Sequence, residues 1–483
     1  MVSGSWWVVC FAGLLTVAAC DAGDEESQGA SGAGGQVAGA AAAGTGVGAG
    51  GTAATDGGAA AGGTPHAAGT SGDGGTHEGS AAAGAEANDA GASAAGSASG
   101  GAPETGGLGG QSAGGDASGG EAGQGEAAPA VAYVSSLLGE LVVASLDPTS
   151  GAPTPLPSSP VDVAGSLHGV AVGADGKFLF VAAEPDRIDT YPIAADGSLP
   201  AEPSSSAPVD DDNLLLAIAL DPLGRFAYGL SPFSKSIYAF SVEPSTGVLT
   251  PSAEPLLVGS APDHRGPAFA AVDPTGRFVY VTQLPVGPSP DDGIRGYRVD
   301  PTSGELTELA NSPFADGNVA AGALVFRPDG KFLFSSGGGV NAFAIDDDGN
   351  LGLVEGSPFS LDVQSDPWAP NIAIDPQGKL LYVTNFGPTR HVTGFAIDAL
   401  SGALEPVPGT PITTAAPYSL ALGPGGRVLY VGDDNGEISA FKVHRPSGRL
   451  SALENSPFPV GGAEAHFAFV TLPGALRATS GSR

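Results

Sequence analysis

One short phrase that recurs seven times constrains this chain more than any other feature of its sequence. Each copy has an apolar strand, a tight turn with glycine and a more polar strand, as in SVEPSTGVLT and RVDPTSGELT. The recurrence distance is about 45 to 57 residues, measured between the turn glycines Gly151, Gly197, Gly247, Gly304, Gly349, Gly402 and Gly448. Self-similarity at this distance, in units made of strands, is typical of propeller blades.

A second phrase alternates with the first and adds two strands to each unit. VDPTGRFVYV and IDPQGKLLYV are two of its six copies. Proline presets φ and glycine accepts positive φ, so this spacing suits a tight turn. The strand after the turn is rich in aromatic and β-branched residues, as expected for a strand packed between sheets. The two phrases together predict four strands per unit.

The two ends of the repeat array complement each other. The first unit lacks its first strand, and HFAFVTLPG from His466 resembles the first strand of the unit that begins at Pro267. We therefore expect this terminal segment to lie beside the opening strand, which removes an unpaired sheet edge. The predicted fold is all-β: a seven-bladed β-propeller of four-stranded blades over residues 129–474, closed by a C-terminal strand in the first blade. Residues 475–483 are predicted to form a tail.

The first twenty residues are predicted to be a lipoprotein-type signal segment. Residues 6–19 are largely apolar, too short to span a bilayer comfortably, and end in LTVAAC. Small residues before a cysteine resemble the bacterial lipobox, and this resemblance implies lipidation of Cys20. The chain is thus predicted to be exported to the cell envelope and anchored by lipid to a bacterial membrane. Both cysteines, Cys10 and Cys20, lie in this segment, so the propeller is expected to have no disulfide.

Residues 21–128 are predicted to form a disordered linker. They are mostly Gly, Ala, Ser and Thr, with 13 acidic residues and no Lys or Arg, a composition that cannot bury enough apolar surface to order itself. The rest of the chain has 38 acidic and 18 basic residues, which argues against binding to nucleic acid. A match to the pattern GxSxG at 110–114 lies in this linker, without the strand and helix that the pattern requires.

Histidines at the starts of the innermost strands are the best candidates for chemistry. His168 and His466 are candidate catalytic residues, because a histidine at the mouth of a central channel can act as a general base on water. Hydrogen bonding and ring stacking at the same mouth would suit a polyhydroxylated ligand. The candidate ligand-binding residues are His264, Arg265, Asn213, Trp368, Asn371 and Tyr418. His391 and His444 are predicted to be surface residues.

Short acidic clusters, such as Asp346 to Asp348, raise the question of a metal ion. None has the spacing of an EF-hand, and Asp next to Gly is ordinary hairpin chemistry. No cofactor is predicted, and the alternative is a Ca²⁺ or Mg²⁺ ion in the channel.

The strands DPTGRFVYVT and DPQGKLLYVTN, with hairpins that end in SPF, resemble the lactonase family of seven-bladed propellers. This family includes bacterial 6-phosphogluconolactonases, so the resemblance implies hydrolysis of a sugar lactone. His168 matches a histidine that opens an early inner strand in the family. Two further family histidines are absent at Asn213–Leu215, and a late family arginine is replaced by Tyr418.

Three functions are compatible with these observations. The first is an envelope-anchored, lactonase-like propeller that binds a small polar ligand or an envelope protein at the channel mouth. The second is a hydrolase that opens a sugar lactone by histidine-assisted attack of water. The third is a structural envelope protein without a specific ligand. In each case we expect a monomer that reaches the membrane only through its lipid anchor.

Overall fold

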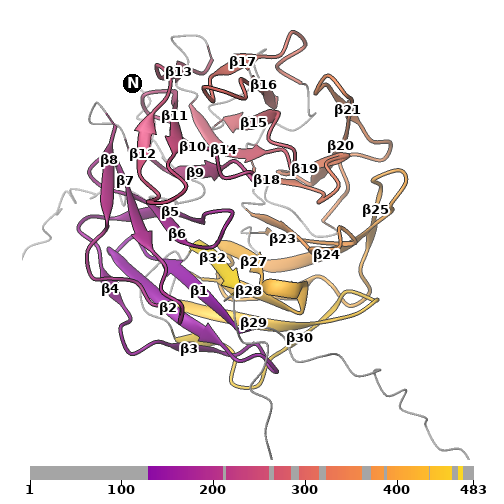
Figure 1. The fold of residues 1–483 in the computed structure, drawn as a ribbon. Coiled ribbons are helices and arrows are strands. Elements are labelled where there is room, and N and C mark those ends of the chain that lie inside the picture. Colours follow the sequence, from indigo (N-terminus) through magenta and orange to yellow (C-terminus); the bar gives the residue numbers. More distant parts are fainter. Residues whose placement is uncertain are drawn as a thin grey trace, which may run out of the picture. The chain divides into compact units, whose positions relative to one another are not determined.

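The computed structural model describes residues 129–209, 214–259, 266–283, 293–314, 322–361, 371–385, 389–433, 436–459 and 466–471. Seven antiparallel sheets are arranged in a ring around a central axis (Figure 1). Within the described residues the one helical element is a short 3₁₀ turn, η1 (Pro424–Gly426). The prediction of an all-β, seven-bladed propeller is therefore confirmed.

Four strands form the main path of each sheet, and the innermost strand comes first in the following lists. The first three sheets are β32 (His466–Thr471), β1 (Ala130–Ser135), β2 (Glu140–Leu146), β3 (Pro153–Pro155); β5 (Leu167–Val172), β6 (Phe178–Ala183), β7 (Arg187–Pro192), β8 (Ser205–Pro208); and β9 (Ala217–Leu220), β10 (Phe226–Ser231), β11 (Ser236–Val242), β12 (Leu249–Pro251). The next two are β14 (Pro267–Val272), β15 (Phe278–Gln283), β16 (Arg295–Val299), β17 (Leu306–Glu308); and β18 (Leu324–Phe326), β19 (Phe332–Ser336), β20 (Val340–Ile345), β21 (Leu351–Leu353). The last two are β22 (Ile372–Ile374), β23 (Leu380–Asn385), β24 (His391–Ile397), β25 (Leu404–Pro406); and β27 (Ser419–Leu422), β28 (Val428–Gly432), β29 (Glu437–His444), β30 (Arg449–Ala452).

Four of the sheets carry a fifth, two-residue strand that the repeat pattern does not reveal. Each of these strands pairs with the third strand of its sheet; they are β4 (Val161–Asp162), β13 (Leu256–Leu257), β26 (Ile412–Thr413) and β31 (Phe458–Pro459).

The ring closes where the sequence predicts. β32 pairs antiparallel with β1, and the register places His466 opposite Ser135 and Val470 opposite Val131. β1 pairs on its other side with β2, so the terminal strand completes the first sheet. The innermost strands of successive sheets contact each other around the whole ring, including β27 with β32 and β32 with β5. The channel therefore has a wall of seven strands.

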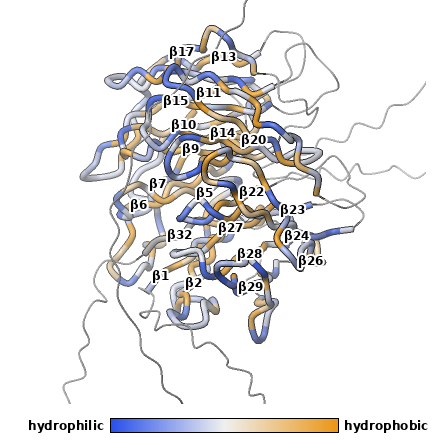
Figure 2. The backbone as a smooth tube through the Cα atoms, turned by 90° about the vertical axis from the view of Figure 1, so that its right-hand side faces the viewer, coloured by the Kyte–Doolittle hydropathy of each residue, from blue (hydrophilic) through white to orange (hydrophobic). Residues whose placement is uncertain are grey.

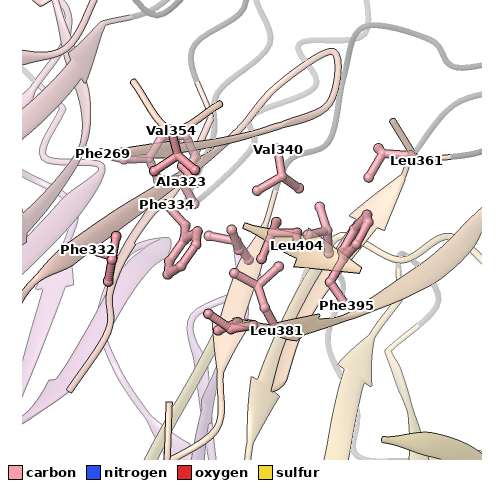
Figure 3. Packing of buried hydrophobic residues seen from close by; sticks show 14 of the residues in the cluster. Phe269, Ala323, Phe332, Phe334, Val340, Val354, Leu361, Leu381, Phe395 and Leu404 are labelled. Carbon is pink, nitrogen blue, oxygen red and sulfur yellow. The ribbon is translucent and has the colours of Figure 1, made fainter. Parts of the chain in front are cut away.

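Apolar side chains fill the spaces between neighbouring sheets. Figure 2 shows hydrophobic stretches along the strands and hydrophilic stretches at turns between them. In the largest cluster, Phe334 and Val340 of the β18–β21 sheet face Leu381 and Phe395 of the β22–β25 sheet (Figure 3). Close packing of this kind holds each sheet to the next and supports a rigid channel wall.

A tyrosine hydroxyl links neighbouring sheets at five of the seven interfaces. Each tyrosine lies on the second strand of its sheet and donates to the carbonyl of a turn glycine in the next sheet. The pairs are Tyr133–Gly197 at 2.8 Å, Tyr228–Gly304 at 3.1 Å, Tyr280–Gly349 at 2.7 Å, Tyr382–Gly448 at 2.6 Å and Tyr430–Gly151 at 2.6 Å. The last pair crosses the closure of the ring. The two repeated phrases are thus bonded to each other across the sheets.

The glycine of the first phrase has a second role in this contact. Gly304 has φ of 75°, and a Cβ atom added there would lie 2.6 Å from Cδ1 of Phe226 in the preceding sheet. Positive φ and the absence of room both require glycine at this turn. The phrase therefore recurs because each turn must fit under the neighbouring sheet.

Candidate functional site

An axial cavity of about 370 Å³ lies at the centre of the ring. Two adjacent residues from each of the seven innermost strands line the cavity, and in two cases the first of them is the residue just before the strand. They are Gly169, Val170, Ala217, Ile218, Phe269, Ala270, Ala323, Leu324, Asn371, Ile372, Ser419, Leu420, His466 and Phe467. The volume is within the range of roughly 300–1,000 Å³ that is usual for sites of small ligands.

Polar side chains on this wall come from one side of the ring. Asn371 precedes β22, Ser419 begins β27 and His466 begins β32, and these three strands are consecutive neighbours. The Asn371 side-chain amide donates to the Tyr418 carbonyl at 3.5 Å, which connects β22 to the next strand. One arc of the cavity therefore offers hydrogen-bonding groups.

His168 continues this polar arc on β5, the neighbour of β32. It lies at a register shift between Leu167 and Gly169 in the pairing of β5 with β6, and such a bulge re-aims the side chain of the extra residue. Its side chain is fully buried, and Nε2 lies 3.3 Å from Oε1 of Glu184. The Glu184 side chain is 39% exposed, so it is the member of the pair that solvent reaches.

A buried ion pair holds the backbone that carries Glu184. Arg187 Nε donates to Asp189 Oδ2 at 2.9 Å, while its Nη1 donates to the Glu184 carbonyl and its Nη2 to the Ala164 carbonyl at 2.6 Å. Asp189 is 1% exposed and also accepts from the Ser206 hydroxyl at 2.5 Å. Because its charge is paired and hydrogen-bonded, this arginine fixes the turn that follows β6.

The pKa of each of these two histidines, His168 and His466, is lowered, which favours the neutral form. Burial, and to a smaller extent the nearby His168, lower the pKa of His466 to about 3. Burial also lowers the pKa of His168, while Glu184 opposes that change through its hydrogen bond and charge. His466 Nε2 and His168 Nδ1 are buried without a hydrogen-bond partner among the described residues. Each ring therefore has one nitrogen whose hydrogen-bonding capacity no described residue satisfies.

Three of the predicted site residues lie at or beside the axial cavity, and a fourth, Tyr418, does not line it. His466 and Asn371 line the cavity and His168 lies beside it, whereas Tyr418 packs against the apolar cluster of the β18–β25 sheets. Asn213, His264, Arg265, Trp368 and Cys20 lie outside the described residues. Glu184 was missed by the sequence reasoning, since it follows a strand and belongs to neither repeated phrase.

The prediction that His391 is a surface residue is wrong. This side chain is 3% exposed at the start of β24, and burial lowers its pKa. Its Nδ1 contacts the Thr389 carbonyl. Beta-sheet pairing with Asn385 and Thr413 on both sides of its strand accounts for the burial. His444 is partly exposed and contacts Ser451 Oγ at 2.8 Å.

Within the part of the chain that the structure describes, no group of three or more His, Cys, Asp or Glu residues is arranged to hold a metal ion. Acidic side chains in the described residues accept hydrogen bonds from backbone N–H groups in turns. Asp273, for example, accepts from the backbone N–H groups of Arg277 at 2.6 Å and Phe278 at 2.7 Å.

Comparisons with known proteins agree with the fold and with the predicted resemblance. Residues 257–465 match the family model "Lactonase, 7-bladed beta-propeller". A 6-phosphogluconolactonase of Yersinia pseudotuberculosis is 26% identical over 312 residues, which cover 62% of this chain and 86% of the relative. The chain is thus similar to lactonase propellers in sequence, and these matches support its relationship to them.

Solved structures share the architecture. A protein of Bacteroides fragilis superimposes with a TM-score of 0.61 at 20% identity, covering 72% of this chain and all of that one. The periplasmic gluconolactonase of Pseudomonas aeruginosa gives a TM-score of 0.58 at 21% identity, covering 71% of this chain and 100% of that chain. At these identities the likeness concerns the fold.

None of the helices in the described residues has the length and apolar character needed to cross a membrane.

Proposed function

We propose that the propeller hydrolyses a lactone ring bound at the mouth of the axial cavity. The observation that carries this proposal is the His168–Glu184 pair, held beside a cavity whose wall includes His466. The similarity to 6-phosphogluconolactonases supports the reaction class. A hydrolase is favoured over a purely structural propeller, because the axial region is an open cavity with His466 on its wall rather than a plug of apolar side chains.

The different solvent exposures of the His168 and Glu184 side chains assign a role in catalysis to each residue. Glu184 is the accessible group and accepts a proton from the attacking water as a general base. His168, in the tautomer protonated on Nε2, donates to Oε1 and orients the carboxylate. It is therefore a positioning residue that acts through Glu184, with the roles of carboxylate and histidine reversed relative to hydrolase triads.

The reaction balances without any further reactant. Water loses a proton to Glu184 and its oxygen bonds to the lactone carbonyl carbon. The ring C–O bond then breaks, and its oxygen takes the proton back from Glu184, which leaves a hydroxy acid. Neutral His466 can donate from Nε2 to the oxyanion that forms on the carbonyl oxygen, a contribution that strengthens in the transition state.

Substitution of Glu184 by glutamine tests this assignment. In full-length protein, Glu184→Gln should lower kcat at least 100-fold with little change in KM, because the base is lost and the shape is kept. Glu202→Gln is the matched control, since Glu202 is exposed in the β7–β8 connection. Hydrolysis of δ-gluconolactone, its 6-phosphate and δ-valerolactone would be followed at constant pH. The proposal fails if every lactone reacts only at its spontaneous rate, or if Glu184→Gln matches its control.

A second function at the same cavity is binding of a small polar ligand without catalysis. The low pKa of His466 favours it, because an imidazole that stays neutral binds by hydrogen bonds and is a weak base. Saturable binding of a δ-lactam, a stable analogue of the lactone, by a protein that hydrolyses no lactone would select this function.

We also propose that the chain is exported and anchored through a lipid on Cys20. The support is the LTVAAC sequence before a Gly-rich, acidic segment. Mass spectrometry of the mature N-terminus from a bacterial membrane fraction tests this. A diacylglyceryl-modified cysteine is expected, and an unmodified or uncleaved N-terminus would contradict it.

A further inference from the structure

One interface of the ring departs from the pattern of the others. It lies between the β5–β8 sheet and the β9–β12 sheet, where Phe180 occupies the position of the linking tyrosine on the second strand. Phe334 makes the same change in the β18–β21 sheet, but Arg327 there donates from Nη1 to a backbone carbonyl of the next sheet at 2.7 Å. In the β5–β8 sheet, Lys177 Nζ lies 2.9 Å from Oδ2 of Asp175 in its own turn. Among the described residues, this interface therefore has neither the tyrosine link nor a link from a turn arginine.

A cavity of about 140 Å³ remains at this interface, although the Thr190 hydroxyl donates across it to the Gly247 carbonyl at 3.2 Å. The cavity is at the end of the sheets opposite the channel mouth, because β5 begins beside the mouth at Leu167 and Gly173 follows its last residue. All the turns around it lie within the described residues, and most of the surface that faces it is apolar. Its lining includes Phe178 and Phe180 of one sheet, Leu220 and Val242 of the other, and the exposed residues Leu223 and Pro244 at the rim.

A substitution in the turn after β5 accounts for part of this space. Aspartate occupies the corresponding place in three other sheets, at Asp221, Asp273 and Asp375. In the β14–β17 sheet, Asp273 Oδ1 accepts from the backbone N–H of Phe278 at 2.7 Å. Gly173 takes the place of this aspartate after β5, so the N–H of Phe178 has no carboxylate at the corresponding position. Because an N–H group of a buried residue costs free energy when it lacks an acceptor, a ligand oxygen that accepts from it would be favoured.

The last sheet of the chain shows what happens when only the aspartate is lost. Gly423 takes its place there, but Tyr430 retains the linking hydroxyl, and a Cβ added to Gly423 would lie 2.7 Å from Cε2 of that ring. The cavity at this second interface is only about 50 Å³. At Gly173 the nearest atom to an added Cβ is Cε2 of Phe180, at 3.4 Å. Loss of both the carboxylate and the hydroxyl therefore accompanies the larger cavity.

We propose that the cavity beside Gly173 is a binding site for an uncharged molecule with one six-membered ring and a carbonyl group. The ring packs against the apolar lining, and the carbonyl oxygen accepts from the Phe178 N–H in place of the missing carboxylate. A cavity of roughly 150 Å³ with apolar walls accepts benzene, so a volume of about 140 Å³ suits one ring. This binding does not depend on lactone hydrolysis, because the site is at the opposite end of the sheets from the channel mouth.

The charges at the rim of the cavity favour an uncharged ligand. Asp175 is paired with Lys177, and Asp221 is paired with Arg225 through a contact of 2.6 Å between Oδ2 and Nε. An anionic ligand would be repelled by Asp175, whose Oδ1 lies 3.7 Å from a Cβ placed on Gly173. An ammonium group has no lone pair with which to accept from the backbone N–H. A neutral carbonyl group meets both conditions.

Titration with small aromatic probes tests the site. Full-length protein with labelled leucine and valine methyl groups would be titrated with benzamide and followed by NMR. Benzamide should shift the methyl signals of Leu220 and Val242 and saturate with a Kd of about 1 mM. Toluene, which has no acceptor, and benzylammonium, which has only donors, should bind about fivefold more weakly. The proposal is overturned if these signals do not shift saturably, or if either control probe binds as tightly as benzamide.

Two glycine variants test the role of the missing carboxylate. Gly173→Asp introduces the carboxylate that Asp273 supplies in its own sheet, so it should occupy the place of the carbonyl and weaken benzamide binding about tenfold or more. Gly352→Asp makes the same change at an exposed residue of β21, where the nearest atom to an added Cβ is 3.9 Å away, and should leave the Kd unchanged. Equal affinities in the two variants, with methyl spectra that show both to be folded, would contradict the assignment.

A second pair of variants tests the apolar rim without disturbing the turn. Leu223 is 57% exposed, so Leu223→Ala should leave the fold intact and weaken benzamide binding about threefold. Leu400→Ala removes a leucine that is 93% exposed in the turn between β24 and β25 and should have no effect on the Kd. Equal Kd values in these two variants would show that benzamide binds elsewhere.

Discussion

At the scale of single residues, the site depends on histidines that the fold keeps uncharged. His168, His391 and His466 all have a lowered pKa, with burial as the largest cause. Transfer of a charged imidazole out of water costs more than transfer of a neutral one, so the folded chain takes up protons less readily than the unfolded chain. The chemistry of the cavity is thereby tied to the stability of the propeller.

This coupling predicts loss of stability in mild acid. Below the ordinary pKa near 6.5, the unfolded chain binds protons on these histidines and the folded chain does not, so the free energy of unfolding falls as pH falls toward the lowered values. Denaturant titrations at pH 7 and pH 5 measure the loss. In His466→Gln the loss over this interval should be smaller by about 2 kcal/mol. An unchanged loss would mean that His466 is no harder to protonate in the folded state.

Only some site residues could be predicted from the sequence. His466 was predictable because it opens a strand-like segment that completes the repeat pattern. Glu184 was not, since its contact with His168 requires the register of β5 with β6 and a bulge within it. A bulge depends on how two strands pair, and neither strand alone carries a signal for it. The burial of His391 likewise follows from pairing on both sides of β24.

At the scale of strands and turns, the hairpin glycines and the tyrosines join each sheet to the next. The repeated phrases made the main path of each sheet predictable, because turn chemistry and apolar strands recur in the same order. The two-residue outer strands, such as β4 and β31, were not predictable, since so short a pairing has no periodicity to detect. Their contribution is local and does not alter the channel wall.

Replacement of Gly304 by alanine should reveal the double constraint on these turns. The substituted residue would adopt positive φ and press on Phe226, so the free energy of unfolding should fall by about 2 kcal/mol or more. Gly352→Ala is the control, because the nearest atom to an added Cβ there is 3.9 Å away. Chemical denaturation of both variants gives the difference. Similar losses would show that contact with the neighbouring sheet is unimportant.

At the scale of the whole molecule, ring closure delivers part of the site. β32 pairs with β1 and brings His466 to the cavity beside β5. This closure was predictable, because the first repeat lacks a strand and the final segment has the sequence of one. What could not be predicted was which residues meet at the axial cavity, because they come from seven separate segments that surround one axis.

Removal of the closing strand should therefore abolish both stability and activity. Deletion of residues 466–483 exposes the edge of β1 and removes His466, so cooperative unfolding and lactone hydrolysis should both be lost. Deletion of residues 472–483, which follow β32, is the control and should retain both. Calorimetry and the hydrolysis assay report the two properties. A stable, active propeller without β32 would contradict the role of closure.

The order of strands along the chain has a consequence during synthesis. β1 emerges from the ribosome early, whereas its partner β32 follows six complete sheets later. Until translation has passed Thr471, the first sheet presents an open hydrogen-bonding edge to any neighbouring nascent chain. A nearly full-length product that ends before β32 therefore keeps this edge unpaired, and we expect it to aggregate.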